Sequence, residues 1–362
     1  MSQLGLGMEP DTGAHARRDR RQGSGGRAVL VAVAALVAVG LAVFFGIKAL
    51  GGATSQQFAG DGDGSATIVV AKGDSLRQIG QTLAAAGVVA DEGSFTDAAE
   101  SDSRAQSISP GTYTLHQHMS GEAAVALMLD PSSRQVKKLT IPEGWRMERI
   151  LAAASKATGL PADSLKESLS RAGTLGLPAY AEGSPEGFLF PATYEFQPGV
   201  TADQVVSAML KRFNQAATDA DLAASAKAIG RTPLEAVTVA SILEIEAAPD
   251  DYDKVARVIY NRLDKGMRLQ LDSTVNYALG VSTLKLNAAQ LKTDSPYNTY
   301  VTKGLPPGPI DSPGDAALQA ALNPADGPWL YFVTTDPKTK KTEFATTYDQ
   351  FLLLKKKFQN AG

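Results

Sequence analysis

The sequence of 362 residues contains no cysteine and only three histidines, His15, His116 and His118. The missing cysteine excludes disulfide bonds, thiol catalysis and cysteine-ligated metal sites. Because no histidine lies in the C-terminal two-thirds, we expect no Ser-His-Asp triad and no histidine-rich zinc site there. The formal net charge of −3 argues against a nucleic-acid partner, which usually meets a basic face. Chemistry in the C-terminal part would therefore come from carboxylates, amides and hydroxyls, and we expect neither a metal nor a cofactor.

One long apolar run lies near the N-terminus. Residues 28–47 carry no charge, and about 20 such residues can cross a bilayer as a helix. Five arginines precede the run and Lys48 follows it, which places the N-terminus in the cytoplasm. A cleaved signal peptide is the alternative, but the run is longer than a typical signal core and no Ala-x-Ala site follows it at once. The prediction is a cytoplasmic disordered tail (1–27), a transmembrane helix (28–48), a flexible stalk (49–65) and an extracytoplasmic remainder.

A small α/β module is predicted for residues 66–133. Its elements follow from short apolar runs and turn residues: a strand at 67–71, helices near 76–86 and 94–100, a returning strand at 111–115 and a helix at 121–129. The arrangement resembles a LysM-type domain, which implies binding of N-acetylated glucosamine polymers. A spacer domain is the alternative. His116 and His118 lie on one side of the returning strand, where we expect exposed surface.

The rest of the chain alternates helices with a few strands, which predicts a mixed α+β fold. Residues 134–230 form a connecting α/β region. Its expected elements are a strand at 136–141, a helix at 147–158, a helix starting near 160, an aromatic-rich extended segment at 187–196 and a helical region from 201 to about 224. Residues 231–362 form the predicted catalytic domain.

A strongly apolar helix is predicted for residues 232–246, and it ends in two carboxylates, Glu244 and Glu246. Thr232 and Glu235 make a capping box, and Pro233 occupies the first helical position. A buried carboxylate is costly unless it is paired or neutral, and the C-terminal end of a helix is unfavourable for an anion. Both effects raise a carboxyl pKa, as a general acid at neutral pH requires.

Two polar loops follow this helix. Residues 267–277 and 294–310 are rich in Gln, Asn, Asp, Ser, Thr and Tyr, side chains that bind sugar hydroxyls, amides and ring faces. Proline and glycine fix the shape of the second loop at 304–309. Helices at 252–265 and 314–322, strands at 329–333 and 342–346, and a last helix from Tyr348 complete the prediction. A rigid polar loop beside a buried acid is typical of a carbohydrate site.

The helix end Ala240-Ser-Ile-Leu-Glu-Ile-Glu246 resembles the Ala-Ser-Ile-Val-Glu-Lys-Glu motif of the YceG-like family, membrane-anchored endolytic murein transglycosylases. Two departures stand out: Ile245 replaces the family's lysine, and Ala192 replaces an aspartate. The resemblance covers roughly residues 65–350. Further matching motifs lie at 141–145, 187–191, 255–263, 266–275, 295–300, 304–310, 321–326 and 330–333.

The resemblance implies that Glu246 is catalytic. On a helix Glu246 shares a face with Leu243 and Val239, whereas Glu244 is displaced by about 200°. We therefore expect Glu244 to be a structural acid bonded to a nearby loop. Asn261, in the middle of a helix, is either a supporting residue or a structural bridge. The other candidate supporting residues, which would orient the sugar, are Gln270, Asp272, Ser273, Thr274, Tyr297, Asn298 and Thr299.

The implied reaction is non-hydrolytic cleavage of the β-1,4 bond between N-acetylmuramic acid and N-acetylglucosamine, which leaves 1,6-anhydro ends on nascent glycan strands. The implied partners are glycan strands and the membrane, with peptidoglycan synthases and the division or elongation machinery as candidate protein partners. A lysozyme-like hydrolase is one alternative, because Asp272, Asp294 or Asp311 can supply a second carboxylate. A non-catalytic, membrane-tethered peptidoglycan-binding protein is the other.

Overall fold

A computed structural model describes residues 57–283, 285–336 and 341–361 of the chain. The chain divides into two compact units, Met1–Ser133 and Arg134–Gly362. The predicted cytoplasmic tail, the transmembrane helix and the first part of the stalk lie outside the described residues. Within the described ranges, no helix has both the length and the apolar character needed to cross a membrane.

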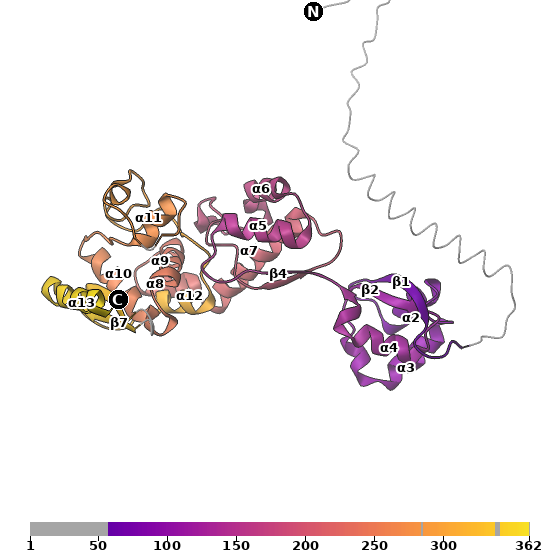
Figure 1. Ribbon diagram of the computed structural model, residues 1–362. Helices are drawn as coiled ribbons and strands as arrows, with labels where there is room; N and C mark the ends of the chain where they lie inside the picture. Colours follow the sequence, from indigo (N-terminus) through magenta and orange to yellow (C-terminus); the bar gives the residue numbers. More distant parts are fainter. Residues whose placement is uncertain (1–56, 284, 337–340, 362) are drawn as a thin grey trace, which may run out of the picture. The chain divides into compact units, whose positions relative to one another are not determined.

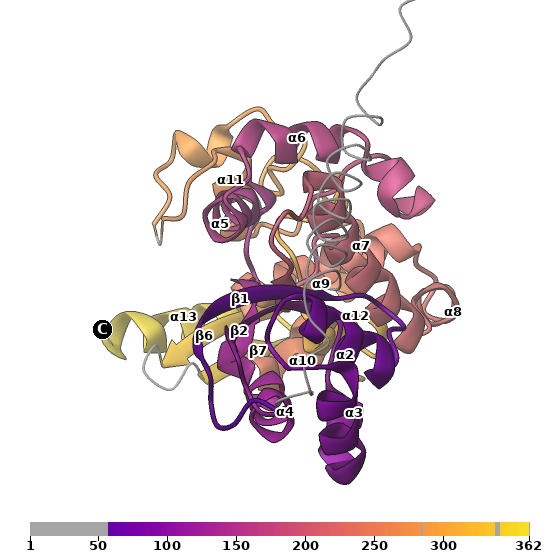
Figure 2. The same ribbon diagram turned by 90° about the vertical axis from the view of Figure 1, so that its right-hand side faces the viewer.

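The first unit is a small module of strands and helices. Its elements are β1 (Asp63–Val70), α2 (Leu76–Ala85), α3 (Glu92–Ser101), the 3-10 turn η1 (Ser103–Ser107), β2 (Gly111–Gln117), α4 (Gly121–Leu129) and the turn η2 (Pro131–Ser133). Strands β1 and β2 pair antiparallel, with the buried side chains of Ile68 and Tyr113 opposite each other. In both Figure 1 and Figure 2 the helices lie on one side of these strands. The predicted order of elements is confirmed, and β1 starts three residues inside the predicted stalk.

Close packing of two helices fixes this module. A Cβ atom at Gly121 would overlap the carbonyl oxygen of Ser94, so α4 can approach α3 only because residue 121 is glycine. His116 and His118 lie at the end of β2, both exposed. The Nδ1 atom of His116 is 2.9 Å from the carbonyl oxygen of Asp61, just before β1, and that of His118 is 2.9 Å from the carboxylate of Asp63, the first residue of β1. The two histidines therefore join the ends of the paired strands.

The second unit is mainly helical. Its strands are β3 (Arg134–Gln135), β4 (Lys137–Thr140), β5 (Thr193–Phe196), β6 (Tyr331–Asp336) and β7 (Lys341–Ala345). Its helices are α5 (Met147–Thr158), α6 (Ala162–Ser170), α7 (Ala202–Asp219), α8 (Leu222–Ala228), α9 (Pro233–Glu246), α10 (Tyr252–Asp264), α11 (Asp272–Ala278), α12 (Asp315–Leu322) and α13 (Tyr348–Ala361), with short 3-10 turns η3 (Ala172–Leu175), η4 (Ala179–Ala181), η5 (Pro249–Asp251) and η6 (Gln290–Lys292). The regions that the sequence separated at residue 230 share one hydrophobic core.

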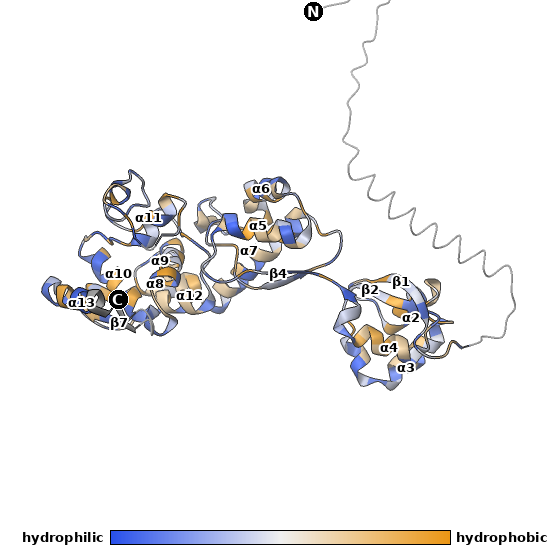
Figure 3. Cartoon of the chain, viewed as in Figure 1, coloured by the Kyte–Doolittle hydropathy of each residue, from blue (hydrophilic) through white to orange (hydrophobic). Residues whose placement is uncertain are grey.

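Helix α9 lies at the centre of this core. It packs against α8, α10, α11 and α12, and its residues 236–243 are all buried. The predicted capping box is present: the backbone N–H of Glu235 donates to Thr232 Oγ1, and that of Thr232 donates to the Glu235 carboxylate. Figure 3 shows the apolar colouring of the helices in this region. A helix buried on all sides holds its last turn, which carries Glu244 and Glu246, in one position.

An antiparallel pair of strands and an aromatic cluster hold α5 and α7 in this unit. Strand β4 pairs with β5, with Leu139 opposite Tyr194. The predicted extended segment 187–196 is a strand only from Thr193. Its first part turns, because Gly187 has φ +86°, and a Cβ atom there would overlap the Pro309 ring. The turn brings Phe188 against Phe213 of α7, with ring centroids 4.8 Å apart.

The helical region that the sequence placed at 201–224 is interrupted. Helix α7 ends at Asp219 and α8 begins at Leu222, because Asp221 adopts the left-handed conformation with φ +44°. Aspartate tolerates this conformation better than most residues. The residues at this break give only a weak signal in the sequence that the helix ends there, so the two helices were predicted as one helical region.

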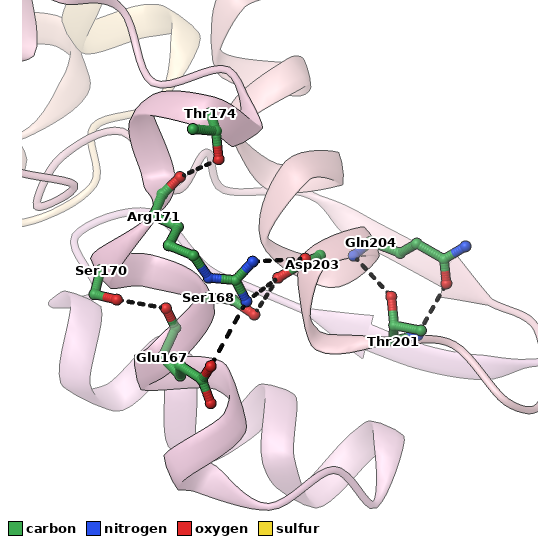
Figure 4. A network of polar contacts seen from close by, with 8 residues as sticks. All are labelled: Glu167, Ser168, Ser170, Arg171, Thr174, Thr201, Asp203 and Gln204. Carbon is green, nitrogen blue, oxygen red and sulfur yellow. Dashed lines mark hydrogen bonds and ion pairs between the residues drawn. The ribbon is translucent and has the colours of Figure 1, made fainter. Parts of the chain in front are cut away.

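A polar network holds α6 against the first turn of α7 (Figure 4). The buried hydroxyl of Ser168 donates to Asp203 Oδ1 at 2.6 Å, and Arg171 donates to both carboxylate oxygens at 3.2 and 3.3 Å. Glu167 is paired with Arg171 only at 4.0 Å and is exposed. The buried hydrogen bond from Ser168 to Asp203 should therefore contribute more to the stability of this junction than the exposed pair of Glu167 and Arg171.

We expect Asp203→Ala to lower the free energy of unfolding of the second unit by about 1–2 kcal/mol, because the buried Ser168 hydroxyl loses its acceptor. The matched control Glu167→Ala removes only the exposed pair and should change stability by less than about 0.5 kcal/mol. Urea unfolding followed by tryptophan fluorescence measures both variants, since Trp145 and Trp329 are the only tryptophans and both lie in this unit. Equal losses in the two variants would contradict the prediction.

Candidate active site

A cavity of about 400 Å³ opens where the start of α5, the end of α9 and helix α11 come together. Its walls include Gly144, Arg146 and Arg149 from the start of α5 and the segment before it, Ile245 from α9, and Ser273 and Asn276 from α11. Ile245 is 53% exposed, although the rest of α9 is largely buried. The cavity therefore lies against the turn of α9 that carries the two glutamates.

Glu246 directly follows Ile245, a lining residue of this cavity. Its side chain is partly buried, and Oε1 accepts a hydrogen bond of 3.2 Å from the backbone N–H of Ser273, a cavity residue. Burial raises the pKa of the Glu246 carboxyl, the hydrogen bonding of Ser273 opposes that rise, and the nearby Asp272 carboxylate adds to it. The net effect is a raised pKa, so more of Glu246 is protonated near neutral pH than for an ordinary glutamate.

A second acid lies beside Glu246. Asp272 is exposed, and its Oδ1 accepts a hydrogen bond of 2.6 Å from the Tyr300 hydroxyl. Burial first, and then this hydrogen bond and the charges of Asp272 and Glu246, raise the pKa of Tyr300. The Tyr300 hydroxyl therefore stays protonated and remains a donor to Asp272.

Two buried threonines join the predicted polar segments. Thr299 Oγ1 lies 2.9 Å from Thr274 Oγ1 and accepts a hydrogen bond of 3.0 Å from the backbone N–H of Leu271. The Thr274 hydroxyl in turn donates to the Leu271 carbonyl at 2.8 Å. Thr274 and Thr299 are fully buried. They hold the start of α11, and thereby the N–H of Ser273, against Glu246.

The prediction of a continuous loop at 267–277 was wrong. Residues 272–278 form helix α11, so Asp272, Ser273 and Thr274 lie in its first turn. The polar residues there do not show the apolar period of a helix, and buried hydrogen bonds to Thr299 stabilise it instead. Just before it, Gln270 has φ +55° and an exposed side chain, and its backbone N–H donates to the Thr299 carbonyl at 3.1 Å.

Three further candidate residues make contacts within the protein. The amide of the buried Asn298 donates to the carbonyls of Leu291 and Thr293, which fixes the loop before Thr299. The Tyr297 ring packs against Tyr277 with centroids 4.7 Å apart. The Asn261 amide donates to the carbonyls of Gly327 and Trp329, both at 2.9 Å. Asn261 was predicted to be either a supporting residue or a structural bridge, and these contacts are those of a structural bridge.

Glu244 faces different neighbours from Glu246. Its Oε1 accepts a hydrogen bond of 2.7 Å from the backbone N–H of Gly314, and its Oε2 accepts one of 2.9 Å from the Tyr252 hydroxyl. Burial raises the pKa of Glu244, and the two hydrogen bonds oppose the rise. Both oxygens therefore fix the loop before α12 and the start of α10.

Two more buried acids lie near this site, Asp311 in the cavity lining and Glu186 close enough to interact with its charge. Asp311 is 1% exposed, and neither of its carboxylate oxygens has a hydrogen-bond partner among the described residues. Burial, followed by the charges of Glu244 and Glu186, raises its pKa well above the ordinary value, although Arg146 opposes the rise. Glu186 is buried too and accepts hydrogen bonds from the Met147 N–H and the Tyr277 hydroxyl. Burial therefore favours the protonated, uncharged form of the Asp311 carboxyl.

Sequence reasoning missed the wall of the cavity that α5 provides. Arg146 and Arg149 lie about a hundred positions before Glu246 in the chain, and nothing in their local pattern indicates a site. The one signal that could have indicated these arginines is the Ile-Pro-Glu-Gly-Trp motif at 141–145, directly before them, which matched the family but was given no role. In the described part of the chain, no group of three or more acidic or histidine side chains is arranged to hold a metal ion.

Known proteins resemble this chain over most of its length. The sequence model of the YceG-like family matches residues 68–357. A protein of Streptococcus pneumoniae (strain D39) named endolytic murein transglycosylase is 30% identical over 305 residues, which cover 74% of this chain and 54% of the relative. One of the same name from Bacillus subtilis (strain 168) is 32% identical over 239 residues, 62% of this chain and 66% of the relative. The chain thus spans about half the length of the streptococcal relative.

One solved structure is also similar. The crystal structure of a YceG-like protein from Listeria monocytogenes aligns with a TM-score of 0.57 and 29% sequence identity. The alignment covers 80% of this chain and 98% of that one. The likeness therefore extends over nearly the whole of the Listeria protein.

Proposed function

Because the chain belongs to the YceG-like family, we propose that it is a lytic transglycosylase that cuts peptidoglycan glycan strands, with Glu246 as its catalytic acid. The observation that carries the assignment of Glu246 is its hydrogen bond to the backbone N–H of Ser273, a residue that lines the cavity, together with its raised pKa. Glu244, by contrast, has both oxygens occupied by its neighbours.

The proposed reaction uses one carboxyl group twice. Protonated Glu246 donates its proton to the oxygen of the β-1,4 bond between N-acetylmuramic acid and N-acetylglucosamine, and the bond from that oxygen to C1 breaks. The Glu246 carboxylate then accepts the proton of the muramyl C6 hydroxyl as its oxygen bonds to C1. The product is a 1,6-anhydro end, and the carboxyl returns to its protonated state. Since the nucleophile belongs to the substrate, no second protein carboxylate is needed.

Hydrolysis is the competing reaction, and the place of Asp272 beside Glu246 is the observation in its favour. Asp272 is exposed and could act on a water molecule as a general base. Asp311 is a weaker candidate, because its raised pKa favours the uncharged form, which does not accept a proton.

The mass of the products decides between these reactions. We expect glycan strands digested with the full-length protein to carry anhydro ends, lighter than hydrolysed ends by one water molecule, about 18 Da. Mass spectrometry of digested sacculi and of nascent strands measures the difference. Ends of the heavier mass would establish a hydrolase, and the absence of any new end would favour a non-catalytic binding protein.

The N-terminal apolar run extends this proposal. If residues 28–48 span the membrane, the tether keeps the site close to the bilayer, where new strands are polymerised. We infer that the enzyme cuts and terminates growing strands beside the peptidoglycan synthases, with the first unit as a LysM-like glycan-binding module. Co-purification with synthases in mild detergent at native expression levels tests the inference, and a lack of association would count against it.

A further inference from the structure

The lining of the cavity beside Glu246 includes two arginines. Arg146 and Arg149 line it from α5, with Glu148 as the one exposed acid between them. Asp311, the other acid in the lining, is buried, and burial raises its pKa. The two guanidinium groups therefore share the lining with one exposed and one buried acid, and Ile245 contributes an apolar side chain.

Aromatic rings hold the two arginines in place, and the charge of Arg146 also opposes the rise that burial causes in the pKa of the buried acids Glu186 and Asp311. The Arg149 guanidinium lies over the Trp145 ring, 4.0 Å from its centroid. That of Arg146 lies 5.3 Å from the centroid of the Tyr277 ring and donates one hydrogen bond, to the Val281 carbonyl. Neither forms a salt bridge with any acid among residues 57–283, 285–336 and 341–361. Stacking on aromatic rings orients a guanidinium and leaves its other N–H groups available for a ligand.

The chemistry of the proposed substrate supplies a matching group. In a peptidoglycan strand every second sugar bears a lactyl group, and this group carries either a peptide with free carboxylates or, once the peptide is removed, a carboxylate of its own. Arginine binds carboxylates through two parallel N–H donors and remains charged at all relevant pH values. A cavity that contacts the glycan near the cleaved bond would also meet the substituent of the neighbouring muramic acid.

We propose that Arg146 and Arg149 form a carboxylate subsite, which selects glycan strands whose muramic acid bears an ionised stem peptide. The inference rests on the proposed function, because it takes the cavity as the glycan site. It adds a substrate preference: peptide-bearing strands with free carboxylates bind more tightly than strands in which those carboxylates are amidated. The carboxylate of the bare lactyl group is the second source of the same chemistry.

The test measures binding separately from cleavage. Full-length protein with Glu246→Gln is titrated calorimetrically with three forms of the same short glycan: peptide-bearing, peptide-bearing with chemically amidated carboxylates, and stripped of peptides by an amidase. We expect the first to bind about tenfold more tightly than the second, since a charge-assisted pair is lost on amidation. Tightest binding of the stripped form would instead place the lactyl carboxylate in the subsite and overturn the peptide preference.

Three further variants locate the effect. Adding Arg149→Gln should reduce the difference between free and amidated strands to less than about threefold. The matched control Lys156→Gln removes a positive charge from an exposed position in the last turn of the same helix and should leave the difference unchanged. Adding Ile245→Lys to the Arg149→Gln protein returns a positive charge to the cavity lining from another element, α9, and should restore part of the difference.

The outcomes separate this inference from the proposed function. Equal affinity for free and amidated strands, together with anhydro ends in digests by the unmodified protein, would overturn the subsite and leave the transglycosylase intact. Selective binding that Arg149→Gln removes, without any new glycan ends, would overturn the enzyme and leave a carboxylate-selective glycan-binding site. An equal loss of selectivity in Lys156→Gln and Arg149→Gln would also overturn the subsite, since it would show a general effect of charge.

Discussion

Replacing Glu246 with glutamine should lower the rate of strand cleavage by about 10²- to 10⁴-fold, the usual contribution of a general acid. Glutamine has nearly the same shape and can still accept the Ser273 N–H, so the fold should not change. It has no proton to give to the glycosidic oxygen and cannot accept one from the C6 hydroxyl. The release of anhydro ends per unit time measures the rate, and circular dichroism and urea unfolding verify the fold.

Glu244→Gln is the matched control, because it removes the other carboxyl of the same helix turn. Its effect should be mainly on stability, since Glu244 is bonded to Gly314 and Tyr252. An active Glu246→Gln protein together with an inactive Glu244→Gln protein would reverse the assignment of the acid.

The pH profile provides an independent check on Glu246. Burial raises its pKa, so the donating form persists below this raised value, and cleavage should decline as the pH rises through it. Asp272→Asn removes a charge that contributes to the rise, so the decline should then begin at a lower pH. A decline at the same pH in both proteins would show that another group controls it.

Thr299→Val should lower the free energy of unfolding by about 1–3 kcal/mol, because the buried N–H of Leu271 loses its acceptor. The same change removes the contact with the Thr274 hydroxyl and loosens the first turn of α11. Since this turn supplies the N–H that orients Glu246, we also expect cleavage to fall by at least about tenfold, as small displacements of catalytic groups are costly.

The control for this variant lies three residues further along. The Thr302 hydroxyl donates only to the carbonyl of Asn298, within its own loop. Thr302→Val should therefore cost less than about 1 kcal/mol and leave cleavage nearly unchanged. Urea unfolding and the rate of anhydro-end formation are measured on both variants. If Thr299→Val matched Thr302→Val in both measurements, Thr299 would have no special part in holding the site.

Much of the local structure could be predicted because its signals are local. The start of α9 follows from Thr232, Pro233 and Glu235, which satisfy the first N–H groups of the helix by themselves. The antiparallel strands β1 and β2 follow from short apolar runs between turn residues. The opposite directions of Glu244 and Glu246 follow from the geometry of one helix turn. None of these inferences needed a contact with a distant segment.

Other features could not be predicted because distant contacts decide them. Helix α11 forms on a polar sequence, because Thr299 accepts the buried N–H of Leu271, the residue before the helix, from 28 positions further along the chain and also contacts the Thr274 hydroxyl. The turn at Gly187 is fixed by the proximity of Pro309. The residues of one segment do not reveal which distant residue will contact it, so neither Thr299 nor Pro309 could be identified as a partner from the sequence.

The sequence by itself determined the order of elements, the family motifs and the choice of two carboxylates at the end of a buried helix. Only the tertiary structure decided which groups meet at the site: the Ser273 N–H at Glu246, the Gly314 N–H at Glu244, and Arg146 and Arg149 in the lining of the neighbouring cavity. The physical reason is that a helix turn is specified by residues three or four positions apart, whereas the charge and hydrogen bonding of a site depend on side chains that meet only when the core packs.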